Sequence, residues 1–251
     1  MVGPVPLVLL HPFPMDAGFW SAVRPALADD RPVIACEFPG LGAAAPEDHP
    51  TVDGFADTVA ETIAREAPGG RAAVCGLSIG GYVALALAAR HPERVAALVL
   101  ADTRAEDDTP EARTGRHAAA LRVRTEGSAG FLDEFVPRLV APGDHASLGA
   151  ARAIADAQDP EAIARALEAL AGRADRRPDL AAMDVPALVI VGGQDTLTPV
   201  SCAQVLVEGL PDAELVVIPE SGHFSALEHP TAFSGAVREF LSRRLPESGA
   251  G

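Results

Sequence analysis

The sequence predicts an α/β protein with a mostly parallel six-stranded sheet, helices on both faces and a helical insertion. Short, nearly continuous apolar runs alternate with longer segments whose apolar residues recur at helical spacing. This alternation is typical of strand–helix–strand units that build a parallel sheet. One stretch of about eighty residues lacks any such run and interrupts the alternation. The six expected strands are 5–10, 32–38, 72–75, 94–102, 186–191 and 213–218.

Helices are expected in the segments between these runs. The clearest covers residues 51–67, where Val52, Phe55, Val59 and Ile63 recur at helical spacing and Thr51 can cap the N-terminus. The Ala/Leu-rich segment 82–90, which follows the third strand, is also expected to be helical. The remaining core helices are expected at 17–28, 199–210 and 230–245.

The insertion is expected to contain three or four helices. It runs from residue 104 to 183, and Pro137 is expected to break or kink one of its helices. The core then consists of residues 1–103 and 184–245, followed by a disordered tail at 246–251. The apolar positions at helical spacing in the insertion are Phe131, Leu132, Phe135, Val136, Leu139, Ile163, Ala166, Leu167 and Leu170.

The composition excludes several classes of partner. The net charge is −15, and all 20 basic residues are Arg, which argues against binding nucleic acid or an anionic membrane. No apolar segment approaches the ~20 residues of a membrane span, and no N-terminal signal is recognisable. The three cysteines have no metal-site spacing, and Cys36 and Cys75 are expected to be buried thiols. We therefore expect a cytoplasmic protein without a metal site.

Ser78 is the strongest candidate for a catalytic residue. It stands in Gly76-Leu77-Ser78-Ile79-Gly80, after an expected strand and before an expected helix. A sharp strand-to-helix turn strains the serine backbone and leaves no room for side chains two residues away on either side, which explains the glycines. The turn exposes the hydroxyl at a helix N-terminus, which favours developing negative charge.

A nucleophilic serine needs a base, and His223 is the leading candidate among seven histidines. It follows the last expected strand in a Gly-His-Phe loop. His11, at the end of the first expected strand, competes with it. The alternative for His11 is a buried histidine that is hydrogen-bonded to loop backbone.

The base needs an orienting acid, and Asp195 is preferred over Asp102. Both residues follow expected strands, and both could instead cap a turn or helix. The order Ser78, Asp195, His223 is the nucleophile–acid–base order expected with this type of serine turn.

An oxyanion formed by attack on a carbonyl needs two N–H donors. Ile79 should provide one, because it directly follows the nucleophile. The loop after the first strand should provide the other, and Phe13 is the candidate because Pro12 and Pro14 have no N–H. Phe13, Trp20 and Phe224 are also expected to wall the substrate pocket, with core packing as the alternative for each. Phe131 and Phe135 are the other expected pocket residues.

These motifs together resemble those of α/β-hydrolase-fold proteins over nearly the whole chain, in particular the 3-oxoadipate enol-lactonase-like and non-haem haloperoxidase-like bacterial hydrolases. The resemblance implies a Ser78–His223–Asp195 triad and a helical cap over the active site. Two features depart from the family pattern: Pro12 replaces the usual glycine of His-Gly-Phe-Pro, and two N-terminal antiparallel strands are missing. The matching segments are 11–16, 76–82, 193–199 and 221–224.

We therefore expect a serine hydrolase that cleaves a carboxylic ester or lactone through an acyl-enzyme, with a small-molecule substrate and no cofactor. Hydrolysis of a carbon–carbon bond, transfer to peroxide, and weakly catalytic ligand binding are the alternatives. The sequence leaves the substrate and the oligomeric state open. Four arginines in or beside the insertion could bind a substrate carboxylate or simply face solvent: Arg104, Arg122, Arg124 and Arg138.

Overall fold

Six strands form one parallel sheet in the computed structural model, which describes residues 4–246. Within these residues all five strand pairings are parallel, in the order β2-β1-β3-β4-β5-β6. The predicted fold class and the six strands are confirmed. The strands are β1 (Leu7–Leu10), β2 (Val33–Cys36), β3 (Ala72–Leu77), β4 (Val95–Ala101), β5 (Ala187–Gly192) and β6 (Ala213–Ile218).

The central strands are buried on both faces, which explains their continuous apolar sequences. Every residue of β1, β3, β4 and β5 is buried. The edge strand β6 alternates instead, and its Leu215 and Val217 are exposed. The central strands therefore carry the core, and their carboxyl ends all meet at one edge of the sheet.

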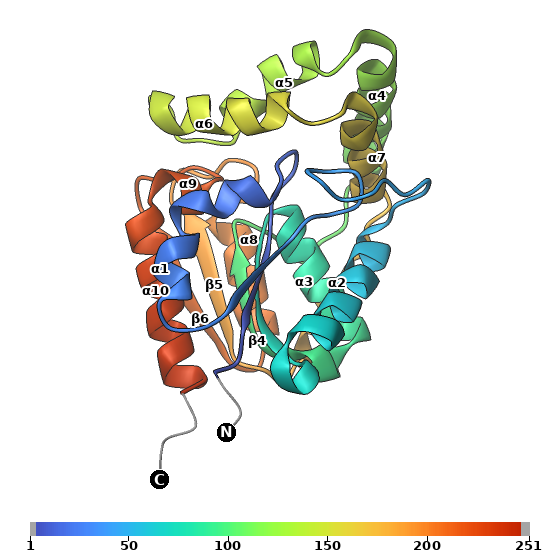
Figure 1. Ribbon diagram of the computed structural model, residues 1–251. Coiled ribbons are helices and arrows are strands. Elements are labelled where there is room, and N and C mark those ends of the chain that lie inside the picture. Colours follow the sequence, from blue (N-terminus) through green and yellow to red (C-terminus); the bar gives the residue numbers. More distant parts are fainter. Residues whose placement is uncertain (1–3, 247–251) are drawn as a thin grey trace.

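Helices cover both faces of the sheet (Figure 1). Helices α2 (Val52–Glu66) and α3 (Ile79–Arg90) pack against each other on one side, and α1 (Arg24–Ala28) packs against α10 (Pro230–Arg244) on the other. Helix α8 (Val200–Gly209) packs on β5 and β6. Short helical turns complete the core: η1 (Ala17–Ala22), η2 (Pro68–Gly70), η3 (Pro92–Arg94), η5 (Arg177–Ala182) and α9 (Ser225–Glu228).

Two local predictions can be compared directly with these elements. Thr51 does cap α2, because its hydroxyl oxygen accepts a hydrogen bond from the Gly54 N–H. The expected helix over 17–28 is wrong in detail, because it divides into the 3-10 turn η1 and the helix α1. Pro25 lies in the first turn of α1, where its missing N–H has no cost, whereas a continuous helix would lose a hydrogen bond there.

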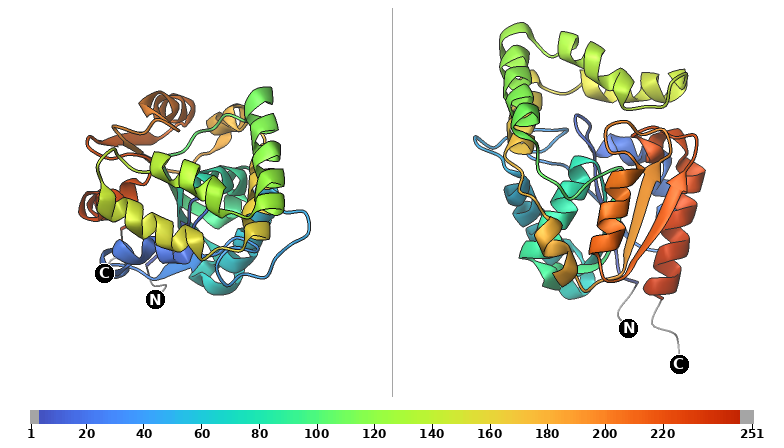
Figure 2. Two further views of the ribbon diagram at one scale, coloured as in Figure 1. Left: turned by 90° about the horizontal axis from the view of Figure 1, so that it is seen from above. Right: turned by 180° about the vertical axis from the view of Figure 1, so that it is seen from behind.

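Besides η5, the segment between β4 and β5 contains four α-helices and one short turn. They rise above the carboxyl ends of the strands and extend over them (Figures 1 and 2). Helices α4 and α7 pack side by side, and Pro137 ends α5 as expected. We refer to α4–α7 as the cap helices. They are α4 (Pro110–Glu126), α5 (Ala129–Phe135), η4 (Val136–Arg138), α6 (His145–Asp156) and α7 (Pro160–Ala171).

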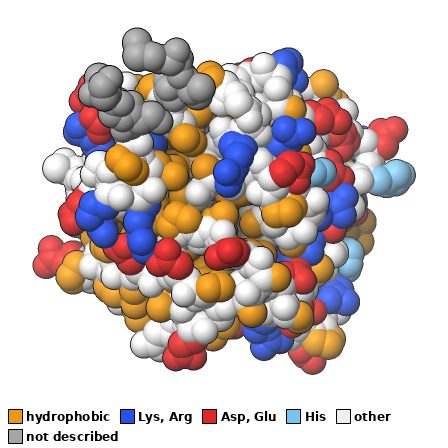
Figure 3. All heavy atoms as spheres, turned by 90° about the horizontal axis from the view of Figure 1, so that it is seen from below, with side chains coloured by type: hydrophobic (Ala, Val, Ile, Leu, Met, Phe, Trp, Pro, Cys, Tyr) orange, Lys and Arg blue, Asp and Glu red, His pale blue; other side chains and the backbone are white. Residues whose placement is uncertain are grey.

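The surface opposite the cap helices carries charges of both signs. Figure 3 shows acidic and arginine side chains interspersed on this face around hydrophobic ones. None of the helices within residues 4–246 is both long and apolar enough to span a bilayer. The predicted tail at 246–251 lies outside the described residues, apart from Pro246.

Candidate active site

Ser78 lies at the sharp turn between β3 and α3. Its backbone has φ 56° and ψ −114°, a left-handed conformation that is strained for any residue other than glycine. A Cβ atom at Gly76 would lie 2.1 Å from the Gly80 carbonyl oxygen, and one at Gly80 would lie 2.1 Å from the Leu10 carbonyl oxygen. Both glycines are therefore required by the close approach of β1, β3 and α3 that holds the serine in place.

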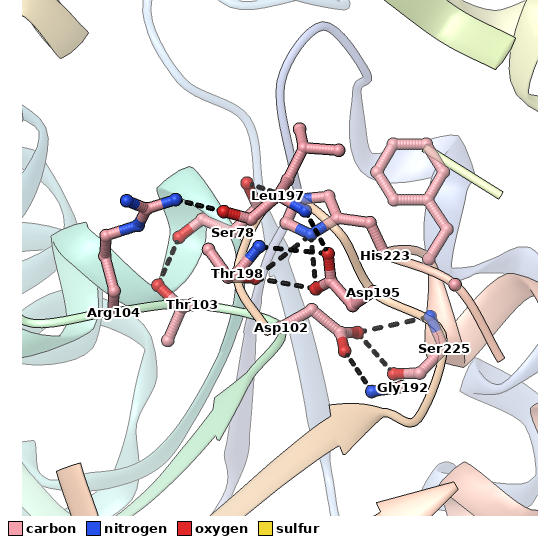
Figure 4. A network of polar contacts seen from close by, with 12 residues as sticks. Ser78, Asp102, Thr103, Arg104, Gly192, Asp195, Leu197, Thr198, His223 and Ser225 are labelled. Atoms are coloured by element: carbon pink, nitrogen blue, oxygen red, sulfur yellow. Dashed lines mark hydrogen bonds and ion pairs between the residues drawn. The ribbon is translucent and has the colours of Figure 1, made fainter. Parts of the chain in front are cut away.

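Ser78, His223 and Asp195 form a continuous hydrogen-bonded row (Figure 4). The distance from Ser78 Oγ to His223 Nε2 is 2.9 Å, and that from His223 Nδ1 to Asp195 Oδ2 is 2.8 Å. The carboxylate can only accept, so Nδ1 carries the proton and Nε2 is free to accept the serine proton. The three residues come from loops that follow β3, β5 and β6, so the parallel sheet brings them to one edge.

Asp195 is held by the turn that follows it. Its Oδ1 accepts hydrogen bonds from the N–H groups of Leu197 (2.8 Å) and Thr198 (3.0 Å). The Thr198 hydroxyl donates to Asp195 Oδ2 at 2.7 Å and lies 3.1 Å from His223 Nδ1. Sequence reasoning missed this role of Thr198, although an Asp followed three residues later by Thr is typical of a side-chain-capped turn.

The electrostatics of the pair favour an ionised acid beside a basic imidazole. Burial is the largest influence on His223 and lowers its pKa, but the Asp195 charge and hydrogen bond outweigh it and leave the pKa raised above 6.5. Burial also acts to raise the pKa of Asp195. The charge of His223 and hydrogen bonds from His223 and Thr198 instead lower that pKa to about 2.

Asp102 is not hydrogen-bonded to the histidine ring. Its Oδ1 accepts from the Gly192 N–H at 2.8 Å, and its Oδ2 accepts from the Ser225 N–H at 3.2 Å and the Ser225 hydroxyl at 2.5 Å. Burial, followed by the charge of Asp195, raises the pKa of Asp102 to about 7. Asp102 therefore joins the end of β5 to the loop that carries His223.

His11 has the geometry of a buried structural histidine. It is fully buried, Nδ1 lies 3.1 Å from the Pro12 carbonyl oxygen, and Nε2 accepts from the Phe38 N–H at 3.2 Å. Burial lowers the pKa of His11 to about 4, so the ring is neutral at physiological pH. The structure thus supports the backbone-bonded alternative for His11, whose ring joins the loop after β1 to the backbone of Phe38.

The two expected oxyanion donors border the serine. Ile79 is the first residue of α3, where a helix N–H has no acceptor within the helix. Phe13 lies in the loop after β1 and lines the same cavity as Ser78 and His223. Their role as oxyanion donors stays a prediction.

A cavity of about 480 Å³ lies over the serine, between the core and the cap helices. Phe131 and Phe135 of α5 line it and stack with ring centroids 5.2 Å apart, and Phe13 packs against both. Leu139 and Leu167 add aliphatic surface. The cavity is of a size that suits a small organic substrate.

Trp20 and Phe224 do not line this cavity, so their prediction as pocket residues is wrong and the alternative of core packing holds for both. Both are fully buried in the core, where each packs against Phe19, and Trp20 also contacts Phe233. The turn η1 packs on β1, β2 and α9, which directs its apolar side chains into the core. An apolar side chain near a site serves equally well as core or as pocket wall, and the sequence does not distinguish the two.

Glu228 is a further residue that the sequence did not reveal. Its Oε2 accepts from the N–H groups of Ala141 (2.7 Å) and Gly222 (3.0 Å), and its Oε1 accepts from the Phe224 N–H and the Ser221 hydroxyl, both at 3.2 Å. Gly222 and Phe224 flank His223, whereas Ala141 belongs to the segment between η4 and α6. One carboxylate therefore joins the histidine loop to the cap segment.

No group of three or more His, Cys, Asp or Glu side chains in the described part of the chain is arranged to hold a metal ion. Cys36 and Cys75 are buried, as predicted, and burial raises the pKa of both thiols, that of Cys36 to about 12.

Comparison with known proteins gives consistent results. A sequence model described as "Alpha/beta hydrolase family" matches residues 7–236. The chain is 32% identical to pimeloyl-[acyl-carrier protein] methyl ester esterase of Neisseria meningitidis serogroup A, over 95% of this chain and 77% of that protein. It is 34% identical to the esterase of the same name from Aromatoleum aromaticum, over 89% and 93% of the two chains.

Solved structures agree in fold. A thermophilic esterase from Thermogutta terrifontis, described as malate-bound, is 33% identical with a TM-score of 0.91 and covers 96% of this chain and 90% of its own. The enol-lactonase from Burkholderia xenovorans LB400 is 30% identical with a TM-score of 0.85, over 95% and 92% of the two chains.

Proposed function

The chain belongs to the alpha/beta hydrolase family, and on this premise we propose that it cleaves carboxylic esters with Ser78 as nucleophile, His223 as general base and Asp195 as orienting acid. One observation carries the proposal: the Ser78–His223–Asp195 row, with contacts of 2.9 and 2.8 Å, ends at the floor of a substrate-sized cavity. A serine hydroxyl is a weak nucleophile without such a base.

Acylation begins when His223 Nε2 takes the Ser78 proton and Oγ attacks the ester carbonyl. Asp195 keeps the Nδ1 proton in place and stabilises the imidazolium that forms. The tetrahedral intermediate carries its charge on the former carbonyl oxygen, where the N–H groups of Ile79 and Phe13 stabilise it. The imidazolium then protonates the leaving alkoxide, and an acyl-enzyme remains.

Deacylation repeats these steps with water as the nucleophile. His223 takes a proton from water, the resulting hydroxide attacks the acyl carbonyl, and the imidazolium returns its proton to Ser78 Oγ. The products are the free acid and the regenerated serine. The same steps open a lactone ring, in which the leaving alcohol stays attached to the acid, and the likeness to the Burkholderia enol-lactonase supports that extension.

The segment 104–183 acts as a lid that selects the substrate. Its helix α5 supplies Phe131 and Phe135 to the cavity wall, opposite Ser78 and His223. These rings leave an apolar surface for an acyl chain or a small alcohol group.

Hydrolysis of simple ethyl esters tests the proposed function. The expected result is acid release, followed in a pH-stat, that is lost with Ser78→Ala and His223→Ala while both variants keep the wild-type melting temperature. Undiminished hydrolysis by folded Ser78→Ala would contradict the proposal, because no other nucleophile is assigned.

A further inference from the structure

The cavity wall contains an arginine without an acidic partner. Arg104 lies in the loop after β4 and lines the cavity that holds Ser78 and His223. Its Nη2 donates to the Leu197 carbonyl oxygen, as Figure 4 shows, and its Nε is buried without a partner. Among the described residues no carboxylate oxygen lies within 4.0 Å of its guanidinium.

Other arginines on the cavity wall and the cap helices do have acidic partners. Arg116 also lines the cavity, but it pairs with Asp108, which Arg173 contacts at 2.7 Å as well. Arg122 and Arg124, which the sequence left as candidates, pair with glutamates of the cap helices. Those glutamates are Glu126 and Glu134 for Arg122, and Glu161 and Glu168 for Arg124.

Arg138 is the second arginine on the cavity wall that makes no ion pair among the described residues. It is exposed, unlike Arg104, and therefore contributes charge at the opening of the cavity. The chain has 35 acidic residues against 20 arginines, so partners for a positive charge are abundant elsewhere. Arg24 and Arg71 also make no ion pair among the described residues, but Arg104 and Arg138 are the two such arginines that line this cavity.

A guanidinium that is partly withdrawn from water is stabilised when an anion joins it. Removing a charge from water has a free-energy cost that one neutral carbonyl oxygen does not offset. The guanidinium has five N–H donors in a planar fork that matches the two oxygens of a carboxylate. Such a pair forms two parallel charge-assisted hydrogen bonds.

We propose that Arg104 binds a carboxylate of the substrate, so that the preferred esters carry a second, free carboxylate group. This inference rests on the proposed ester hydrolysis and names its substrate class. Arg104 holds the carboxylate inside the cavity while Ser78 attacks the ester carbonyl, and Arg138 attracts the anion at the opening. The distance between the two carbonyl groups of the best substrate then measures the spacing between Arg104 and Ser78.

A matched substrate series tests the proposal. Monoethyl esters of malonic to adipic acid carry the carboxylate on the acyl side, and ethyl esters of equal chain length that end in methyl are their neutral counterparts. A parallel series of acetate esters of hydroxy acids places the carboxylate on the alcohol side. Acid release in a pH-stat gives kcat/KM for each ester.

The wild-type protein is expected to prefer one carboxylate ester over its neutral counterpart by at least tenfold. Arg104→Gln should lower kcat/KM for that ester by roughly 10- to 100-fold and change the neutral ester by less than about threefold. The matched control is Arg24→Gln, which should leave both values unchanged, since Arg24 is exposed on α1 and does not line the cavity. Arg104→Lys keeps the charge and should retain part of the preference.

Different results would overturn the role of Arg104 and the proposed ester hydrolysis. Equal kcat/KM for carboxylate and neutral esters in the wild-type protein, with hydrolysis still dependent on Ser78, would overturn the role of Arg104 alone. Equal losses on both substrates in folded Arg104→Gln would do the same. If Arg104→Gln does not fold, a preference for the carboxylate ester that is reduced in Arg104→Lys and at high salt supports the role of Arg104, and a preference that is unchanged under both conditions overturns it. Hydrolysis of neither series would overturn the proposed function itself.

Discussion

Replacement of Glu228 by Gln tests whether one carboxylate holds the loop that carries His223. Each carboxylate oxygen accepts two hydrogen bonds, Oε2 from Ala141 and Gly222, and Oε1 from Phe224 and Ser221. A glutamine has one oxygen and one NH₂ group. In either orientation of its amide, the NH₂ group therefore faces two of these donors, which lose their acceptor.

The expected loss of folding stability follows from those two lost hydrogen bonds. Leaving a donor without a partner costs about 1–3 kcal/mol. Glu228 is half-buried, so water can replace part of the lost hydrogen bonding. We therefore expect the two unpaired donors together to lower the free energy of unfolding by about 2–4 kcal/mol. For a chain of this length that corresponds to a fall of roughly 5–15 °C in the melting temperature. The histidine loop should also shift and slow acylation at Ser78 at least tenfold, because small displacements of catalytic groups are costly.

The assay combines thermal unfolding by circular dichroism with the rate of fluorophosphonate labelling. Glu220→Gln is the matched control, since Glu220 lies in the same loop, is exposed, and should leave both quantities unchanged. A melting temperature and labelling rate equal to those of the wild type in Glu228→Gln would refute the reasoning.

Three further predictions follow from the site. Asp195→Asn should lower kcat by about 10⁴-fold, whereas folded Asp102→Asn should lower it far less, because Asp195 is hydrogen-bonded to the His223 ring and Asp102 is not; comparable losses in steady-state ester hydrolysis would contradict this assignment. The pKa of His223 is raised, so kcat/KM should fall as the pH drops through a value above 6.5, since the protonated ring cannot accept the serine proton; a pH–rate profile that stays level to pH 5 would disagree. Gly80→Ala should abolish labelling or folding, because its Cβ would lie 2.1 Å from the Leu10 carbonyl oxygen; normal labelling of a normally melting variant would show that the turn tolerates a side chain.

The sheet was predictable because its central strands are buried on both faces and therefore have continuous apolar sequences. The helices were predictable from apolar spacing, except where backbone chemistry intervenes, as at Pro25 between η1 and α1. The edge strand β6 contains the charged residue Glu214, yet the apolar residues of 213–218 sufficed to predict the strand.

The positions of Ser78, Asp195 and His223 at one site were predictable because each follows the carboxyl end of a strand, and parallel strands end at the same edge. Thr198 and Glu228 escaped prediction because they act through hydrogen bonds to backbone or to another side chain, which no residue pattern encodes uniquely.

Pocket walls and charge partners depend on packing and were harder to predict. Trp20 is as apolar as Phe131, yet one is core and the other lines the cavity. Likewise, only the folded arrangement of the cap helices shows that Arg124 is neutralised by glutamates whereas Arg104 is not.

Covalent labelling with a fluorophosphonate, read by intact mass, tests the central claim most directly. The account predicts one adduct per chain, located on Ser78 by peptide mapping. Ser78→Ala should abolish the adduct, and His223→Ala should slow its formation strongly, because the hydroxyl would lose its base at 2.9 Å. Absence of any adduct on the folded wild-type protein, or an adduct that survives in Ser78→Ala, would contradict an activated serine at this site.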